Sequence, residues 1–322
     1  MSTCVILGGA GYIGSRWAIR LAGKKQFQRI VLADVRPPLA KLPGQINYLA
    51  CDVRKPISPQ LPDIRPEWIF NFAAVHREPG HAREEYFDTN LAGAKNTCAF
   101  AEQTGCKNIL FTSSIAVYGS LAKPVSETSL PYPTTPYGIS KLCAELIHKG
   151  WRQSAEGRRL YICRPGVIYG PGDPGNILRM IRAIRKGYFV FPGSRNLRKS
   201  YGYIEGLLDS FEFIMARPEN LLTYNYVERE TESLGTLVRT VQSHLGKKIP
   251  TLTAPLPVLT AMAGLVQLAT GGRSPIHPVR VRKTASSTHV LPESLKKMGF
   301  AFRYDFAASL KDWASKSPDD FS

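Results

Sequence analysis

The sequence predicts an α/β protein with a doubly wound parallel sheet and a smaller C-terminal lobe. Three observations lead to this fold class. Short apolar segments alternate with longer amphipathic segments through the first half, a glycine-rich turn follows the first apolar segment, and the Pro- and Gly-rich stretch "RPGVIYGPGDPG" (164–175) marks a change of organisation. Alternating strand and helix signals are typical of βαβ units and a parallel sheet.

The apolar segments of the first half are rich in Val, Ile, Leu and Phe and show little polar alternation. That pattern is typical of strands that are buried on both faces of a sheet. We expect such strands at residues 3–9, 29–35, 67–75, 108–115 and 160–168, with crossover helices at Ile13–Gly23, Asp88–Thr104 and Tyr137–Glu156.

The second half is expected to form mainly a separate lobe. Its pattern predicts a helix at Ile177–Lys186, a strand at 221–227 that returns to the sheet, and a helix at Leu234–Leu245. We therefore expect one domain over residues 1–170, completed by the returning strand, and a second over residues 171–322.

Composition and charge narrow the class of protein. The chain has 322 residues, of which 43% are hydrophobic, and a formal net charge of +17. That length suits one large α/β unit with a smaller lobe. The basic residues are spread along the chain, and no run of five or more like charges occurs. We interpret the charge as a solvated surface that attracts anionic small molecules, and we expect no nucleic-acid partner.

Cysteine usage and the N-terminal residues indicate the compartment. The six cysteines form neither a CxxC pair nor a Cys/His metal pattern, so we expect reduced, mostly buried thiols and no metal site. The start, "MSTCVILGG", enters a strand pattern without a preceding basic segment, so no signal peptide is expected. Both features favour a cytoplasmic location.

One uncharged segment stands apart, "LTAPLPVLTAMAGLVQLAT" at residues 252–270. Pro255 and Pro257 interrupt its first part and leave an apolar run too short for a membrane span. We expect a buried helix or a lid helix here. A peripheral membrane contact, supported by Lys247, Lys248 and Arg273 on its flanks, is the alternative.

The glycine-rich turn "LGGAGYIG" (7–14) indicates a dinucleotide site of Rossmann type. Gly8, Gly11 and Gly14 are spaced so that the backbone can turn sharply and approach a pyrophosphate at the N-terminus of the first helix. Tyr12 and Ile13 lie within the same turn. A strand signal precedes the motif and a helix signal follows it, which is the context that gives such a motif its meaning.

An acidic residue at the end of the second predicted strand completes this site. Asp34 is placed to bind the ribose hydroxyls and to repel a 2′-phosphate, so we expect NAD rather than NADP. Arg36, two residues on, works against that preference. Two further segments are expected beside the cofactor: Asp52 and Val53 near the adenine, and Ala73 and Ala74 near the far ribose.

The stretch "TTPYGISK" (134–141) carries the chemistry. Tyr137 and Lys141 share one helix face at a spacing of four. An ammonium beside the phenol favours the phenolate, so Tyr137 could take a hydroxyl proton while a hydride leaves the same carbon for NAD. Of the serine pair Ser113 and Ser114 in "FTSSIAVYGS", Ser114 is expected to bond the substrate oxygen.

On these motifs the chain resembles the extended branch of the short-chain dehydrogenase/reductase superfamily, which includes nucleotide-sugar epimerases and dehydratases. The resemblance implies a catalytic set of Ser114, Tyr137 and Lys141, with Asn90 of "DTNLAG" supporting the lysine. It also implies cofactor contacts from Tyr137 and Lys141, and a homodimer. Ile115 and Ala116 occupy the positions where the dehydratases carry an Asp-Glu pair, so dehydration is disfavoured.

The resemblance also implies residues that bind a nucleotide-diphosphate sugar. "RNLRKSYGYIEGL" (195–207) offers Arg195, Arg198 and Lys199 for the diphosphate, and "HPVRVRK" offers Arg280 and Arg282. His76, directly after "NFAAV", is the residue that we single out in the polar segment 76–90. The expected substrate-binding set is His76, Ser114, Asn176, Arg195, Arg198, Arg280 and Arg282.

Three functions remain open at this point. The first is an NAD-dependent nucleotide-sugar epimerase, expected to be a 4-epimerase, acting through a transient keto-sugar. The second is an NAD(P)-dependent dehydrogenase or reductase of a keto-sugar or a sterol-like alcohol. The third is a cofactor-sensing protein without catalysis, which the intact set of Ser114, Tyr137 and Lys141 argues against.

Overall fold

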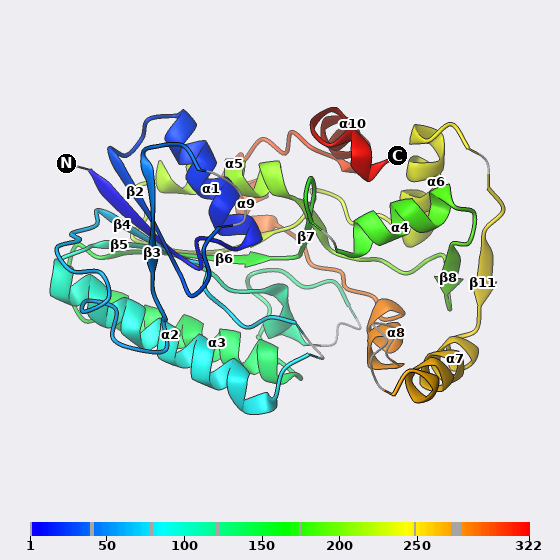
Figure 1. Ribbon diagram of the computed structural model, residues 1–322, viewed down its shortest axis with the longest axis horizontal. Coiled ribbons are helices and arrows are strands. Elements are labelled where there is room, and N and C mark those ends of the chain that lie inside the picture. Colours follow the sequence, from blue (N-terminus) through cyan, green and yellow to red (C-terminus); the bar gives the residue numbers. More distant parts are fainter. Residues whose placement is uncertain are drawn as a thin grey trace. The chain divides into compact units, whose positions relative to one another are not determined.

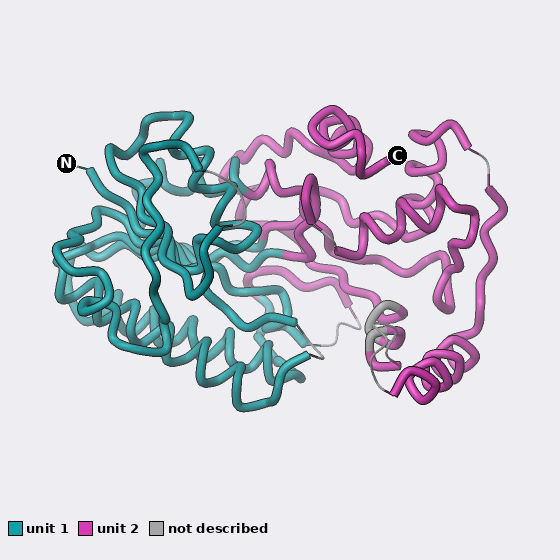
Figure 2. The backbone as a smooth tube through the Cα atoms, viewed as in Figure 1, with its two compact units in different colours: residues 1–119, 129–165, 208–225 teal, residues 120–128, 166–207, 226–322 magenta. Residues whose placement is uncertain are grey.

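The chain divides into two compact units, coloured separately in Figure 2. The computed structural model describes residues 2–38, 42–77, 80–119, 123–173, 175–247, 249–271 and 278–322, without the side chains of Arg280, Lys283 and Thr284. Unit 1 comprises residues 1–119, 129–165 and 208–225, and unit 2 comprises residues 120–128, 166–207 and 226–322. The expected division into a domain of residues 1–170, completed by the returning strand, and a domain of residues 171–322 remains a prediction.

The strands are β1 (Thr3–Leu7), β2 (Arg29–Asp34), β3 (Ile46–Ala50), β4 (Trp68–Asn71), β5 (Asn108–Thr112), β6 (Arg159–Pro165), β7 (Val167–Tyr169), β8 (Val190–Pro192), β9 (Tyr201–Tyr203), β10 (Leu221–Tyr226) and β11 (Leu252–Ala254). The α-helices are α1 (Tyr12–Gly23), α2 (Arg83–Thr104), α3 (Pro136–Gln153), α4 (Asn176–Arg185), α5 (Ile204–Met215), α6 (Leu234–His244), α7 (Leu256–Ala269), α8 (Pro278–Thr284), α9 (Glu293–Lys297) and α10 (Phe306–Lys316). Two short 3₁₀ helices, η1 (Ile115–Tyr118) and η2 (Pro318–Asp320), complete the description.

Unit 1 is built on a seven-stranded sheet in the order β10-β6-β5-β4-β1-β2-β3. The pairs that β1 forms with β2 and β4 are parallel, as are β2–β3, β4–β5 and β5–β6. The chain order reverses between β1 and β4, and such a switch point is where open α/β sheets bind ligands. The predicted doubly wound parallel sheet is confirmed.

Helices cover both faces of this sheet (Figure 1). On one face, Trp17 of α1 packs edge-on against Phe70 of β4 and Phe211 of α5, with ring centroids 5.5 and 5.4 Å apart. Arg20 of α1 also bonds Asp209 of α5 at 2.6 Å. On the other face α2 and α3 pack side by side. Because both faces are covered, all five residues of β1 are buried, as its apolar sequence requires.

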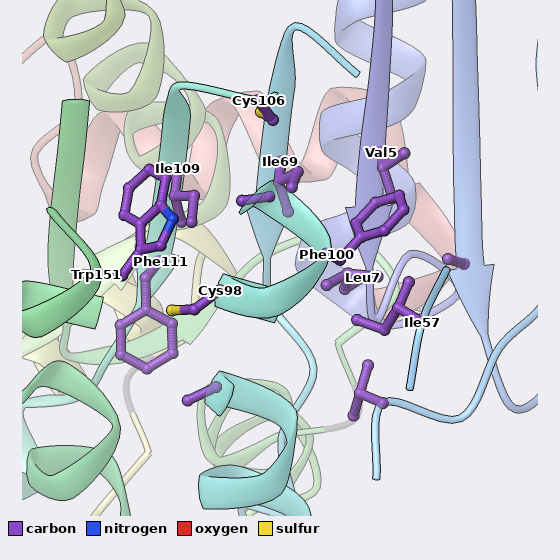
Figure 3. Close-up of a cluster of buried hydrophobic side chains, with 14 of the residues drawn as sticks. Val5, Leu7, Ile57, Ile69, Cys98, Phe100, Cys106, Ile109, Phe111 and Trp151 are labelled. Atoms are coloured by element: carbon purple, nitrogen blue, oxygen red, sulfur yellow. The ribbon is translucent and has the colours of Figure 1, made fainter. Parts of the chain in front are cut away.

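The main core of unit 1 lies between the sheet and the α2–α3 layer, and Figure 3 shows its labelled members. Val5 and Leu7 of β1, Phe100 of α2 and Phe111 of β5 are each at most 1% exposed. Burying aromatic and aliphatic side chains of this size contributes roughly 1.5–3 kcal/mol each relative to exposure. This core fixes the strand ends that carry the residues discussed below.

Several strand boundaries differ from those expected, and the backbone gives the reasons. The first strand ends at Leu7 rather than residue 9, because Gly8 has a positive φ of 72°. The strand expected at 160–168 is split into β6 and β7 at Gly166. Helix α2 begins at Arg83 rather than Asp88, since Glu85 caps it by accepting a 2.9 Å bond from the Ala82 backbone N–H.

Several elements of the structure were not predicted from the sequence pattern. The strands β3, β8, β9 and β11 are short, and the helix α5 lies in an apolar stretch for which no element was expected. Of the two alternatives expected for residues 252–270, a buried helix or a lid helix, the buried one is wrong. The segment does form a helix, α7, but only Ala263 of its residues is buried. Within the described residues, no helix is both long and apolar enough to cross a membrane.

Unit 2 has its own buried polar centre. Tyr169 of β7 donates a hydrogen bond to Glu228 and lies 2.7 Å from the Ser309 hydroxyl of α10. Burial raises the pKa of Glu228 to about 8. A two-stranded pair, β8 with β11, connects the segment after α4 to the segment before α7.

A buried histidine of α3 makes the stability of unit 1 dependent on pH. His148 donates from Nδ1 to the Ala144 carbonyl at 2.7 Å and accepts at Nε2 from the Asn71 amide at 3.3 Å. Its ring stacks on Phe111 at 4.3 Å. Burial lowers its pKa to about 4. A folded pKa below the unfolded value means that stability is present above about pH 6.5 and is lost as the pH falls toward 4.

We therefore predict that His148→Gln flattens this pH dependence, since glutamine keeps an acceptor for Asn71 but does not titrate. Between about pH 7 and pH 4.5 the wild type should lose roughly 2–3 kcal/mol more unfolding free energy than the variant. Urea unfolding of both proteins at the two pH values measures the difference. Equal losses in the two proteins would contradict the neutral, buried state of His148.

Candidate cofactor and catalytic site

The glycine-rich turn lies at the switch point of the sheet, where three strand ends meet. The Gly8 N–H donates to the Ala33 carbonyl of β2 at 2.9 Å. A Cβ on Gly8 would lie 2.6 Å from the backbone nitrogen of Ala73, just beyond β4. A Cβ on Gly14, in the first turn of α1, would lie 2.6 Å from the Gly8 carbonyl oxygen. Both positions therefore exclude any larger residue, and the turn brings the start of α1 close to β4.

Asp34, at the end of β2, is held beside this turn. Its Oδ2 accepts a bond from the Ala10 N–H at 3.1 Å, and its Oδ1 accepts from the Arg36 backbone N–H at 3.2 Å. Tyr48 of β3 donates to the Asp34 carbonyl at 3.1 Å. An ionised carboxylate has about four acceptor positions, so these bonds orient it and leave capacity for ribose hydroxyls. The Arg36 side chain is exposed.

Asp52 and Val53, the pair expected near the adenine, make most of their contacts with other residues of the protein. The Asp52 carboxylate pairs with Arg54, which donates from Nη2 at 2.7 Å and lowers the pKa of Asp52. Val53 is 6% exposed and packs in the core beside Gly93, where a Cβ would lie 3.1 Å from the valine. Its carbonyl accepts from Asn96 at 2.8 Å. The Val53 side chain therefore serves the core.

Asn90 of α2 fixes the segment that follows β4. Its Oδ1 accepts from the Val75 N–H at 2.9 Å, and its Nδ2 donates to the Val75 carbonyl at 3.1 Å and to the Ser140 hydroxyl at 2.8 Å. Ser140 in turn donates to the Tyr137 carbonyl at 2.8 Å. These bonds join the segment containing Ala73 and Ala74 to the first turn of α3. The support that the resemblance assigns to Lys141 thus runs from Asn90 through Ser140 and the backbone of α3.

The residues flanking Val75 remain accessible. Ala73 and Ala74 are half-buried, and His76 is exposed. The pKa of His76 is lowered, chiefly because the surrounding protein partly desolvates its ring, and further by the positive charges of Arg77 and Lys141. His81, by contrast, contacts Glu85 at 2.9 Å and belongs to the cap of α2. Of the two histidines, His76 is the one whose pKa is affected by the charge of Lys141.

The sequence "TTPYGISK" starts α3 in a defined way. Thr135 caps the helix by accepting from the Gly138 N–H at 3.2 Å, and Pro136 occupies the first turn, where its missing N–H is no loss. A Cβ on Gly138 would lie 2.5 Å from the Ala116 carbonyl of η1. The glycine therefore lets α3 lie directly on the turn that carries Ser114.

Tyr137 and Lys141 occupy successive turns of α3 but differ in exposure. Tyr137 is half-buried, with its ring centroid 6.3 Å from that of Tyr86. Lys141 is 1% exposed, and its Nζ lies 4.4 Å from the centroid of Phe111. Burial lowers the pKa of Lys141 to about 7, against the opposing influence of Glu145. The lysine is thus a buried cation beneath a more accessible phenol, as the proposed pairing requires.

The structure distinguishes the two serines at the end of β5. Ser114 is half-buried and caps η1, where its Oγ accepts from the Ala116 N–H at 3.1 Å. Ser113 is 2% exposed, and among the described residues its hydroxyl has no hydrogen-bond partner. Only Ser114 combines access with a hydroxyl proton left to donate, which favours the serine chosen from the sequence.

A buried network behind Lys141 was missed by the sequence analysis. Arg164 of β6 makes a two-pronged ion pair with Glu145 of α3 at 2.8 and 2.7 Å and donates to the Tyr118 hydroxyl at 2.9 Å. Tyr118 donates in turn to Asn225 at 2.9 Å. The spacing of four between Lys141 and Glu145 was readable in the sequence, but the partner strand was not.

The residues expected to bind substrate phosphates lie in unit 2. Their hydrogen bonds in the structure go to different partners and do not bring them together in one site. Arg195 donates to the Thr251 carbonyl at 2.6 Å, and Arg198 donates to the Thr231 carbonyl. Burial lowers the pKa of Lys199 to about 8. Asn176 is exposed in the first turn of α4, Arg282 is exposed on α8, and the Arg280 side chain lies outside the described part of the chain.

The residues of unit 1 fit a dinucleotide. The turn from Gly8 to Gly14 leaves backbone in place of side chains at the N-terminus of α1, where a pyrophosphate is favoured. The Asp34 carboxylate lies beside this turn and has acceptor capacity left for ribose hydroxyls, and Lys141 of α3 is a buried amine.

The role of Asp34 can be tested by its charge. We predict that Asp34→Asn weakens NAD binding about tenfold and reduces the preference for NAD over NADP, because a charged acceptor for the ribose hydroxyls is lost. The asparagine oxygen can still accept the Ala10 N–H. Asp63→Asn, the same change at an exposed loop residue, is the control. Measured dissociation constants for both cofactors that match the wild type would exclude Asp34 from the cofactor site.

Comparison with known proteins agrees with this geometry. Residues 4–227 match the model of the NAD dependent epimerase/dehydratase family. An N-acetyl-α-D-glucosaminyl-diphospho-ditrans,octacis-undecaprenol 4-epimerase of Escherichia coli O157:H7 is 34% identical over 248 residues, which cover 74% of this chain and 73% of the relative. A UDP-glucose 4-epimerase of Lacticaseibacillus casei is 29% identical over 54% of each chain.

A solved structure shows that the fold extends over the whole chain. The UDP-glucuronic acid 4-epimerase of Bacillus cereus, crystallised with NAD, superposes with a TM-score of 0.76 at 17% identity and covers 99% of this chain and 100% of its own. With the family match spanning the glycine turn, Asp34 and the segment from Ser114 to Lys141, the expectation of an NAD-dependent enzyme of the epimerase type is confirmed. The chain belongs to the NAD-dependent epimerase/dehydratase family.

Proposed function

We propose that this enzyme is a 4-epimerase of hexoses carried on a diphosphate, with Tyr137 as its base. The observation that carries the proposal is the arrangement on α3, where Lys141 is buried one turn beyond the half-buried Tyr137 and Gly138 seats the helix on the turn of Ser114. Support also comes from the relatives, because the E. coli protein and the UDP-glucose epimerases are both named for position 4 of a diphosphate-linked sugar.

NAD, held by the turn from Gly8 to Gly14 and by Asp34, would supply reversible hydride transfer at C4 of the sugar, so that C4 passes through a ketone and can regain its hydrogen on the opposite face. Tyr137 takes the proton from the C4 hydroxyl and gives it back in the return step. Lys141 favours the phenolate by its positive charge. Ser114 donates a hydrogen bond to the same oxygen and orients it.

The substrate residues follow from charge and exposure. A diphosphate requires charge-assisted donors, and we propose that at least one of Arg195, Arg198, Arg280 and Arg282 supplies them. His76 is proposed to meet a sugar hydroxyl, and Asn176 a phosphate or hydroxyl of the substrate. The homodimer and the cytoplasmic location expected from the sequence also remain proposals.

The deciding experiment offers purified enzyme two substrates without added cofactor, UDP-N-acetylglucosamine and N-acetylglucosaminyl-diphospho-undecaprenol. Interconversion at C4 of either, without net NADH absorbance, supports the proposal and shows which diphosphate carrier is preferred. Net formation of NADH from a sugar or sterol alcohol would instead establish a dehydrogenase. Absence of turnover on every diphosphate-linked hexose would overturn the proposal.

Removing the phenol oxygen tests the base. We predict that Tyr137→Phe lowers kcat about 10²–10⁴-fold, the usual effect of losing a general base. NAD affinity should change little, because the ring and its neighbour Tyr86 keep their places. Tyr188→Phe, which removes the same oxygen from a tyrosine that is 63% exposed, should retain full turnover. Near-normal kcat for Tyr137→Phe on the true substrate would show that another group removes the proton.

A substitution at Gly138 tests whether the close contact between α3 and the Ala116 carbonyl matters for catalysis. We predict that Gly138→Ala lowers kcat at least about tenfold, because the added Cβ must push α3 away from the Ala116 carbonyl and separate Tyr137 from Ser114. Gly150→Ala in the same helix meets nothing within 4 Å and should leave kcat unchanged while stabilising the protein by about 0.5–1 kcal/mol. Comparable kcat values for both variants would dismiss the seating argument.

A further inference from the structure

Helix α7 of unit 2 exposes a set of large apolar side chains that neither the fold nor the proposed reaction uses. On α7, Val258 is 50% exposed, Met262 56%, Leu265 68% and Leu268 82%. Single exposed apolar residues are ordinary on protein surfaces, whereas a concentration on one helix indicates a binding surface.

The exposed residues of α7 form one face of the helix. Val258, Met262 and Leu265 follow at spacings of four and three, and Leu268 extends the same stripe by three. On the other side, Ala263 is 2% exposed and anchors the helix to unit 2. The helix itself carries no charged residue, so nothing on this face provides for contact with water.

The sequence around α7 has a single sign of charge. No Asp or Glu occurs between Glu232 and Glu293, while this stretch contains seven Lys and Arg residues. Helix α8 packs against α7 and presents the exposed Arg282. In Figure 1 the two helices lie together at the lower right, drawn in yellow-gold and orange. An exposed apolar helix within a stretch of purely positive charge offers the two contacts that strengthen peripheral membrane binding, which are apolar area and attraction to anionic lipids.

We propose that the apolar face of α7, together with the basic residues of this stretch, docks the enzyme on an anionic phospholipid surface. A helix of 14 residues is about 21 Å long, shorter than the roughly 30 Å hydrocarbon core, so α7 lies on the bilayer and does not span it. Leu265 and Leu268 enter the acyl boundary, and Arg282 of the neighbouring helix α8 contacts lipid phosphates.

A second copy of the chain fits this surface less well. The commonest homodimers are two-fold symmetric, and their interface places the same surface patch against itself. Here that would bring Arg282 of each copy to the same contact, and the stretch between Glu232 and Glu293 contains no carboxylate to compensate. An anionic bilayer supplies the missing negative charge and an apolar interior at once.

Flotation with vesicles tests the proposal without substrate, so its outcome is separate from that of the epimerase assay. Wild-type enzyme should float with vesicles of phosphatidylglycerol and phosphatidylcholine, not with phosphatidylcholine alone, and less as salt is raised. Leu265→Glu should weaken binding at least tenfold, and Arg282→Glu should weaken it and reduce its salt dependence. Leu130→Glu, the same change at an 86% exposed leucine of unit 1, should bind like wild type.

Two results would overturn the proposal. One is wild-type binding by Leu265→Glu, with its helix content unchanged by circular dichroism. The other is a wild-type enzyme that does not float with anionic vesicles. If in that second case gel filtration shows that Leu265→Glu dissociates a dimer, the face of α7 is an interface between copies of the chain.

Discussion

The contact between α3 and the end of β5 is the constraint on which the rest of unit 1 depends. One face of α3 carries Tyr137, Lys141, Glu145 and His148, and this face is pressed onto the sheet. Phe111 lies between two of them, with the Lys141 ammonium 4.4 Å from its centroid and the His148 ring stacked at 4.3 Å. The contacts that pack the core therefore also position Tyr137 and Lys141, the residues proposed to act in catalysis.

This arrangement places three ionisable groups in a dry interior, and each is accommodated differently. Glu145 finds Arg164 in an ion pair whose side chains are at most 4% exposed. His148 remains neutral, because burial lowers its pKa to about 4. The pKa of Lys141 is lowered only to about 7, so a fraction of this lysine is still charged near neutral pH. Breaking a buried ion pair costs about 3–5 kcal/mol, so the Glu145–Arg164 pair also holds α3 against β6.

Unit 2 distributes its polar residues in another way. Its interior keeps a hydrogen-bonded set of Tyr169, Glu228 and Ser309, while its uncharged helix α7 is exposed. Buried polar groups with partners stabilise a lobe, whereas unpartnered apolar residues at the surface serve contact with something else. The formal net charge of +17 is thus partly a local property, since one stretch of unit 2 contributes seven positive charges and no negative one.

The sequence by itself determined the sheet type, the glycine turn, Asp34 and the Tyr137–Lys141 spacing, because each depends on local pattern and chain order. The contacts that position these residues, by contrast, could not be predicted from the sequence. Gly138 of α3 lies against Ala116, 22 positions earlier in the chain, and Glu145 of α3 pairs with Arg164 of the strand β6. Residues 252–270 show the same limit, because apolar composition cannot distinguish a buried helix from an exposed one. Burial depends on what packs against a segment, and only the tertiary structure decides that.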